Sequence, residues 1–124
     1  MNEHINLPTH TQAMPFSDAV WAGDLLYLSG RIGVIPGTRK LPREATEEAR
    51  LLLDGVRDVL AAANLTMDDL VFVQVSTPDV SLYDVFNGVY TRYFKGPLPS
   101  RAFLGSGPLL SGARFELWGI AKKQ

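Results

Sequence analysis

The sequence predicts an α+β fold in which a mixed sheet carries two helices packed on one face. Two segments, residues 44–63 and 81–94, repeat their apolar residues at the helical period. Short apolar runs bounded by turn residues lie before, between and after these segments, as expected of strands. The resulting order is hairpin, helix, strand, helix, hairpin, which is typical of a sheet covered by helices on one side.

Length and composition limit the classes of protein to consider. The chain of 124 residues is expected to form a single domain over residues 1–124, with its own hydrophobic core. A net charge of −1 and a pI near 6.1 indicate no basic surface, so we expect no nucleic-acid partner. No run approaches the ~20 apolar residues of a membrane span, so no membrane partner is expected. The N-terminus lacks the layout of a signal peptide, and the default expectation is therefore a cytoplasmic location.

The N-terminal part is expected to begin irregularly and then to form a hairpin. Residues 1–12 are polar and predict an irregular lead-in or an edge strand. Residues 20–24 predict a strand that turns at Asp24 and returns over residues 25–29. Gly30 interrupts the returning strand, which indicates a bulge or a close backbone approach.

Periodicity then predicts the two helices and the strands around them. The apolar face of the helix over residues 44–63 consists of Ala45, Ala49, Leu52, Leu53, Val56, Val59, Leu60 and Ala63. Residues 70–75 are apolar and β-branched, which predicts a strand covered on both faces. Residues 81–94 predict a second amphipathic helix with Ser81 as its N-cap. The last two strands, at 101–105 and 114–121, are expected to close the chain as a hairpin.

The closing hairpin holds the chain's clearest chemical signal, because it would place Arg101 and Glu116 opposite each other. A guanidinium donates two parallel hydrogen bonds to a carboxylate. A glutamate can carry a proton if its surroundings tune its pKa. The pair therefore suggests chemistry on a small carboxylic acid. The alternatives are a structural salt bridge between the two, or neutralisation of Arg114 or Arg31 by Glu116.

The second face of the predicted sheet points to self-association. The strands are apolar at most positions, including those that would point away from the helices. A sheet with two apolar faces and helices on only one needs cover for the other, most simply from further copies of the chain. We therefore expect an oligomer.

Five motifs in order connect the chain to a known family. They are Met14-Pro15-Phe16-Ser17-Asp18-Ala19-Val20, Leu28-Ser29-Gly30-Arg31-Ile32, Phe86-Asn87-Gly88-Val89-Tyr90-Thr91-Arg92-Tyr93-Phe94, Pro99-Ser100-Arg101, and Glu116 through Ile120-Ala121. With these motifs and the spacing from Arg101 to Glu116, the chain resembles the RidA (YjgF) family of imine/enamine deaminases. The resemblance extends from about Ala13 to Lys122.

The resemblance implies a chorismate-mutase-like fold in a homotrimer with a central barrel and sites in the clefts between subunits. It also implies an enzyme, a 2-iminobutanoate/2-iminopropanoate-type deaminase, which is a hydrolase acting on C–N bonds. Such enzymes convert reactive enamines and imines, 2-aminoacrylate among them, to 2-oxo acids and ammonia, a form of metabolite damage control. No metal and no organic cofactor is expected, because an imine carbon is already electrophilic.

Residue roles follow from the same resemblance. Arg101 would clamp the substrate carboxylate, and Glu116 would activate the attacking water and carry its proton toward the leaving nitrogen. The backbone of Gly30 and of the strand near Phe103 would hydrogen-bond the ligand. The other residues expected at the substrate are Phe16, Ser29, Arg31 and Asn87.

Three substitutions depart from the family pattern. Phe16 stands where the family usually has a tyrosine, Phe103 where it has a cysteine or a small residue, and Arg31 where it has a glutamine. They leave the identity of the imine open. They also keep a second hypothesis, a non-catalytic small-carboxylate-binding or regulatory trimer. A third hypothesis, an RNA-cleaving protein, conflicts with the near-neutral charge.

Overall fold

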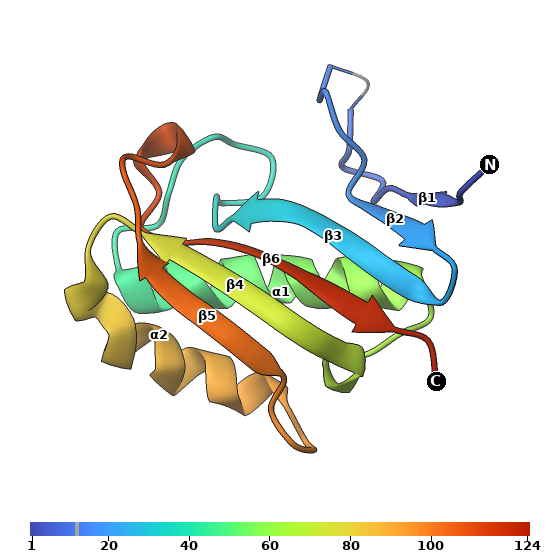
Figure 1. The fold of residues 1–124 in the computed structure, drawn as a ribbon. Helices are drawn as coiled ribbons and strands as arrows, with labels where there is room; N and C mark the ends of the chain where they lie inside the picture. Colours follow the sequence, from blue (N-terminus) through green and yellow to red (C-terminus); the bar gives the residue numbers. More distant parts are fainter. Residues whose placement is uncertain (12) are drawn as a thin grey trace.

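The computed structural model describes residues 1–11 and 13–124, and its strands form one six-stranded sheet in the order β1-β2-β3-β6-β4-β5 (Figure 1). The strands are β1 (His4–Ile5), β2 (Ala19–Ala22), β3 (Leu25–Ile32), β4 (Leu70–Thr77), β5 (Ser100–Gly105) and β6 (Glu116–Lys122). The α-helices are α1 (Ala45–Ala62) and α2 (Tyr83–Tyr90), and the 3₁₀ turns are η1 (Met67–Asp69), η2 (Val80–Leu82), η3 (Thr91–Tyr93) and η4 (Leu110–Gly112). Both α-helices lie on the same face of the sheet, so the predicted α+β class is confirmed.

The predicted closing hairpin is wrong. β5 pairs in parallel with β4, and β6 lies between β3 and β4, antiparallel to both. β4, α2 and β5 therefore form a strand–helix–strand crossover, the only short way to join parallel neighbours. β6 takes the central position because its alternate residues are buried against the helices while β5 stays more exposed at the sheet edge.

The hydrophobic core lies between the sheet and the two helices. Its fully buried members include Leu52, Leu53, Leu60, Phe86 and Phe115. Within one copy, the strand predicted at residues 70–75 is not covered on both faces, since Val73 and Val75 are buried while Phe72 and Gln74, which alternate with them, are only half-buried. Within one copy, only the helix side of β4 is closed.

Two local predictions fare differently. The bulge expected at Gly30 is confirmed, because the pairing of β3 with β6 shifts register between Leu28 and Arg31. The N-cap expected at Ser81 is wrong, since the Asp79 side chain accepts the hydrogen bond of the Ser81 backbone N–H. The second helix is also shorter than predicted, because 3₁₀ turns replace its first and last residues.

The N-terminal lead-in contains a short edge strand, β1, paired with β2. Gln12, the last residue of the predicted lead-in, lies outside the described residues. In the part of the chain that the structure describes, neither α-helix is both long and apolar enough to cross a membrane.

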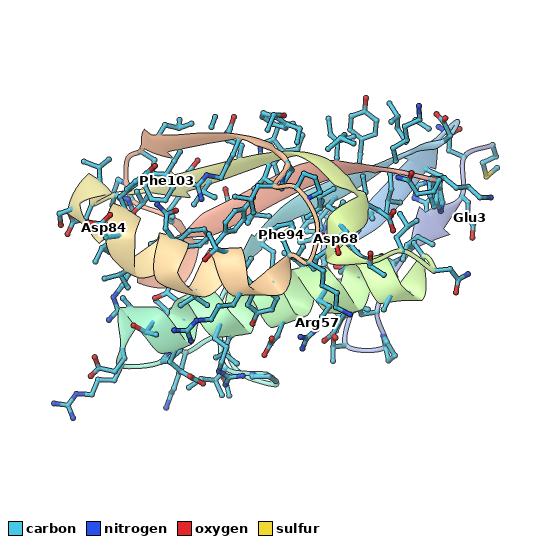
Figure 2. All side chains as sticks on the ribbon, turned by 90° about the horizontal axis from the view of Figure 1, so that it is seen from below. Glu3, Arg57, Asp68, Asp84, Phe94 and Phe103 are labelled. Carbon is cyan, nitrogen blue, oxygen red and sulfur yellow. The ribbon has the colours of Figure 1, made fainter. Side chains whose placement is uncertain are left out.

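The sheet face opposite the helices is open (Figure 2). In that view the helices lie below the sheet, and side chains stand above it with no helix over them. Tyr27 is 43% exposed and Leu104 is 40% exposed, and the Phe72 and Trp118 rings meet edge to face at 5.5 Å between centroids. The expected apolar second face is therefore present, and no described element of the same chain covers it.

Candidate functional site

Arg101 lies at the start of β5, opposite Val73 of β4, and therefore on the helix side of the sheet. Its guanidinium carbon is 4.8 Å from the Tyr90 ring centroid, 5.3 Å from that of Phe103 and 5.6 Å from that of Tyr83. Aromatic ring faces attract a cation at these distances. Three rings from α2 and β5 thus hold the guanidinium in place.

A hollow of about 260 Å³ opens beside Arg101. Its lining consists of Tyr83, Asn87, Tyr90, Thr91, Leu98, Pro99 and Arg101. The Asn87 Oδ1 atom and the Tyr90 hydroxyl are buried and lack hydrogen-bond partners among the described residues. Burial raises the pKa of Tyr90 to about 12, so its hydroxyl remains a hydrogen-bond donor at neutral pH.

Arg101 forms no salt bridge with a carboxylate in the described part of the chain, since none of the ion pairs found there includes this residue. A guanidinium held by rings, with no carboxylate against it, keeps its N–H groups for a ligand. The hollow therefore has the chemistry of a small-anion site with two further polar contacts.

Glu116 begins β6, opposite Ser76 of β4 and Ile32 of β3. It lies against the bulge of β3, where a Cβ added at Gly30 would be 3.2 Å from Glu116 Cδ and 3.3 Å from Oε2. Glycine at position 30 thus leaves the space that the carboxylate occupies. The side chain is partly exposed, on the open face of the sheet.

Arg101 and Glu116 do not meet within one copy of the chain. β4 separates their strands, and their partners on it, Val73 and Ser76, are three positions apart. Side chains an odd number of positions apart on a strand point to opposite faces. The predicted juxtaposition across a hairpin is therefore wrong, as is the alternative of a salt bridge between them within one chain.

The two other proposed partners of Glu116 are occupied. Arg114 pairs with Glu48 at 2.7 Å, and Arg31 pairs with Asp18 at 3.4 Å. Arg31 also lies against α1, where a Cβ at Gly55 would be 2.8 Å from Arg31 Cδ. Its charge is thus directed to the helix side, away from the face that Glu116 occupies.

The remaining predicted residues fall in two groups. Asn87 and Phe103 lie beside Arg101, and the Phe103 ring contacts that of Tyr83 edge to face at 5.1 Å. Ser29 lies in β3 and Phe16 lies in the segment before β2, so both are several strands away from Arg101 in β5. Phe16 is 47% exposed, and the Ser29 hydroxyl donates to the Ser17 carbonyl at 2.6 Å.

Two buried carboxylates with structural roles were not anticipated. Asp18 is 7% exposed and accepts a hydrogen bond from the Leu7 N–H at 2.8 Å, with His10 Nδ1 at 3.3 Å, so it fastens the segment before Phe16. Glu48 is fully buried and accepts the Arg114 backbone N–H at 2.7 Å, close to the start of β6. Only Glu48 had a signal, since its position falls on the apolar face of its helix.

Two other features bear on ligands. A second hollow, of about 460 Å³, is lined by residues of the N-terminus, the end of α1 and the C-terminus, and it contains none of the predicted site residues. Among residues 1–11 and 13–124, no cluster of three or more histidine and carboxylate side chains is arranged to hold a metal ion.

Comparison with known sequences identifies relatives along nearly the whole chain. The family model described as endoribonuclease L-PSP matches residues 8–123. The mouse 2-iminobutanoate/2-iminopropanoate deaminase is 33% identical over 108 residues, which cover 86% of this chain and 80% of the mouse protein. A RutC family protein of Saccharolobus solfataricus is 34% identical over 110 residues, covering 88% of this chain and 87% of that protein.

Solved structures agree with these relatives. RidA from the Antarctic bacterium Psychrobacter sp. superposes with a TM-score of 0.90 at 26% identity, covering 98% of this chain and 99% of that one. E. coli TdcF with bound serine superposes equally well, with a TM-score of 0.90 at 26% identity and coverage of 98% and 99%. In sequence and in fold, the chain belongs to the RidA (YjgF) family.

Proposed function

We propose that the protein is an imine/enamine deaminase that hydrolyses reactive 2-imino acids to 2-oxo acids and ammonia. The observation that carries the proposal is the Arg101 guanidinium, held by three rings at a hollow and unpaired with any described carboxylate. Such a group suits the one feature that all 2-imino acids share, the carboxylate. The name of the mouse relative, 2-iminobutanoate/2-iminopropanoate deaminase, supports the same activity.

The site requires two copies of the chain. Arg101 and Glu116 belong to opposite faces of one sheet, so a substrate held by Arg101 is out of reach of Glu116 in the same copy. We infer a homotrimer in which each site combines Arg101 of one subunit with Glu116 of the next. The open apolar sheet face supports this assembly, because burying it between copies removes apolar surface from water.

The reaction follows from the chemistry of these groups. Arg101 holds the carboxylate in a bidentate pair, which orients the electrophilic C2 atom. Glu116 accepts a proton from water as the water oxygen bonds to C2, and it passes this proton to the nitrogen, which gives an intermediate with a hydroxyl and an NH2 group on C2. Glu116 then carries the proton of the new hydroxyl to the same nitrogen as C2=O forms, so that the C–N bond breaks and NH3 departs. An enamine substrate first gains a proton at C3 and loses one from its nitrogen, and so becomes the imine.

The other residues of the site have supporting roles. The unpartnered Asn87 Oδ1 is an acceptor for the N–H of the substrate, and the backbone of Gly30 and of Phe103 supplies further hydrogen bonds. Phe16 and Phe103 contribute apolar walls. Arg31 and Ser29 already have intramolecular partners, so in this proposal they hold β3 and its bulge in position beneath Glu116.

An assay with an imine made in place tests the proposal. An amino-acid oxidase converts alanine to 2-iminopropanoate, and semicarbazide traps whatever imine survives. We expect the wild-type protein to reduce semicarbazone formation and Arg101→Ala to lose this effect. Arg57→Ala is the matched control, because Arg57 also lies over a tyrosine ring, at 5.5 Å from Tyr93, yet lies outside the site. Equal trapping with wild type and with no protein would refute the deaminase.

A second candidate is a non-catalytic trimer that binds small carboxylates in the same cleft. It is favoured by Phe16, which lacks the hydroxyl of the usual tyrosine. The structure of E. coli TdcF with bound serine supports a cleft of this kind in a relative. Pyruvate binding that depends on Arg101, without any loss of imine, is the outcome expected for this candidate.

A further inference from the structure

Resting on the deaminase function, we propose that Glu48 is a positioning residue for the reaction, because it fixes the backbone that carries Glu116. Glu48 lies in the first turn of α1 and is fully buried within one copy of the chain. Its contacts are therefore those of a single copy. The proposal assigns the placement of the water-activating carboxylate to a second carboxylate, which lies in the core and does not touch the substrate.

The Glu48 carboxylate binds the two residues that precede β6. Its Oε2 atom accepts the Arg114 backbone N–H at 2.7 Å and the Phe115 backbone N–H at 3.3 Å. The pairing of β6 with β3 and β4 begins only at the next residue, Glu116. Since buried backbone N–H groups need acceptors, Glu48 supplies here what a neighbouring strand supplies further along.

The same carboxylate is itself held in place. Its Oε1 atom accepts a hydrogen bond from Arg114 Nη1 at 2.7 Å. The Arg114 guanidinium also donates to the Pro42 carbonyl at 3.2 Å and to the Arg43 carbonyl at 2.7 Å, just before α1. Hydrogen bonds of this charged kind are short and directional. The start of β6 therefore cannot move relative to α1 without breaking several of them.

The backbone of Glu48 also contacts the strand beside Glu116. A Cβ added at Gly33 would overlap the Glu48 carbonyl oxygen, so α1 packs directly on the backbone that follows β3. Gly33 comes after Ile32, which lies opposite Glu116 in the sheet. Phe115 is fully buried on the helix side, so the next side chain, that of Glu116, points to the open face. One residue of α1 thus fixes both backbones that meet at Glu116.

The proposal predicts a loss of rate without a loss of binding, because Arg101 holds the substrate carboxylate and makes no contact with these groups. Glu48→Met keeps the size of the side chain and removes both acceptor oxygens. A displacement of about 1 Å can cost a reaction about a hundredfold, so we expect kcat for 2-iminopropanoate to fall about tenfold while KM stays within about twofold. Glu48→Gln keeps an acceptor oxygen for the two N–H groups and should retain kcat within about threefold of wild type. Semicarbazone trapping at varied oxidase flux gives both constants.

Two further variants exclude a general loss of structure. Glu47→Met is the matched control, because Glu47 precedes Glu48 in α1 but pairs with Arg50 on the surface, and it should leave kcat and KM unchanged. Glu48→Asp keeps the charge and withdraws the carboxylate by about 1.5 Å, one C–C bond, so it should also lower kcat and not KM. All variants are assayed well below their unfolding midpoints, where a role in stability alone leaves kcat of the folded protein unchanged.

Mixed trimers identify which half of the shared site Glu48 serves. In an equal mixture with Arg101→Ala, Glu48→Met subunits supply the intact arginine and Arg101→Ala subunits the intact glutamate, so we expect about a quarter of the wild-type rate. In an equal mixture with Glu116→Gln, no subunit supplies an intact glutamate, and the rate should stay at about a twentieth, the mean of the two pure proteins. A defect spread over the whole Glu48→Met subunit would be rescued by neither partner.

The outcomes separate the two proposals. Wild-type protein that loses imine only at the uncatalysed rate refutes the deaminase itself. If wild type is active, full kcat in Glu48→Met or Glu48→Asp overturns the positioning role and leaves the deaminase intact, as does a kcat in Glu48→Gln as low as in Glu48→Met. Where Arg101→Ala and Glu116→Gln restore each other, rescue of Glu48→Met by Glu116→Gln, or no rescue by Arg101→Ala, also overturns it.

Discussion

At the scale of single residues, the site depends on how each functional side chain is held. Three rings surround the Arg101 guanidinium, and no described carboxylate pairs with its N–H groups. Glu116 has a different support, since the absence of a side chain at Gly30 provides the space beside its carboxylate. The Arg101 guanidinium is therefore positioned by its contacts with aromatic rings, and the Glu116 carboxylate by the space that the missing side chain at Gly30 leaves.

Gly30→Ala tests whether the space beside Gly30 positions the Glu116 carboxylate. The new methyl would lie 3.2 Å from Glu116 Cδ, closer than ordinary contact distance, so the flexible end of Glu116 must move. A displacement of about 1 Å can cost a reaction about a hundredfold, and Glu116 must give by a few tenths of an ångström, so we expect deaminase activity to fall by up to about tenfold with little change in stability.

Gly88→Ala is the control for this substitution. A Cβ at Gly88 meets no atom within 4 Å, and alanine is the better helix former by up to about 1 kcal/mol. We therefore expect unchanged activity and a slightly higher midpoint of thermal unfolding. Full activity of Gly30→Ala would contradict the role given to the space at Gly30 in placing the Glu116 carboxylate.

At the scale of elements, the sequence predicted the helices and most strands but not the order of the strands in the sheet. Apolar periodicity identified α1, and a glycine inside an apolar run indicated the bulge in β3, because both features depend on neighbouring residues. The position of β6 depends on competition between distant segments for the centre of the sheet. For that reason the sequence could single out Arg101 and Glu116 by type and spacing as candidates, but it could not show that they lie on opposite faces of the sheet.

The joint between α1 and β6 makes a stability prediction. Glu48 is fully buried and accepts hydrogen bonds from the Arg114 backbone and side chain, each at 2.7 Å. Removing one member of a buried ion pair typically costs about 3–5 kcal/mol. We expect about 3 kcal/mol for Glu48→Ala, the lower end, because Arg114 is partly exposed and water can replace the lost carboxylate.

Glu47→Ala, the neighbouring substitution, is the control. Glu47 pairs with Arg50 on the exposed surface, where solvent screens the attraction and such pairs contribute little to stability. Urea unfolding of both variants should separate them by about 2 kcal/mol or more. Equal losses would show that the buried pair contributes no more than a surface pair.

Two tyrosines at the end of α2 make an alkaline prediction. Burial raises the pKa of Tyr90 to about 12, and burial together with the hydrogen bond to Asp54 raises that of Tyr93 to about 12. The folded protein therefore holds these two protons when the unfolded chain, with ordinary values near 10, has lost them. Their contribution to stability is complete below pH 10 and is lost as the pH rises toward 12.

Phenylalanine variants distinguish the two hydroxyls. Tyr93→Phe should cost about 1 kcal/mol at pH 7, because the hydroxyl donates to Asp54 at 2.6 Å. Tyr90→Phe should cost nothing measurable, since its hydroxyl has no partner among the described residues. Both variants should lose less stability than wild type between pH 10 and pH 12 in denaturant titrations. A parallel loss in all three proteins would contradict the assignment.

At the scale of the whole molecule, one copy of the chain is incomplete in two respects. Its sheet exposes an apolar face, and its cation and carboxylate face opposite ways. A single arrangement resolves both if copies pack so that Arg101 of one lies near Glu116 of the next. Assembly is then a condition of the deaminase activity as well as of stability.

Mixing two inactive variants tests this arrangement. Arg101→Ala and Glu116→Gln should each abolish activity as pure proteins. In trimers refolded from an equal mixture, a site is intact when its arginine comes from a Glu116→Gln subunit and its glutamate from an Arg101→Ala subunit. Random assembly gives this combination at about a quarter of the sites, so we expect about a quarter of the wild-type rate. If each site instead used both residues of one subunit, every site in the mixture would lack one of them. Continued inactivity of a refolded mixture shown to contain mixed trimers would therefore contradict a site shared between subunits.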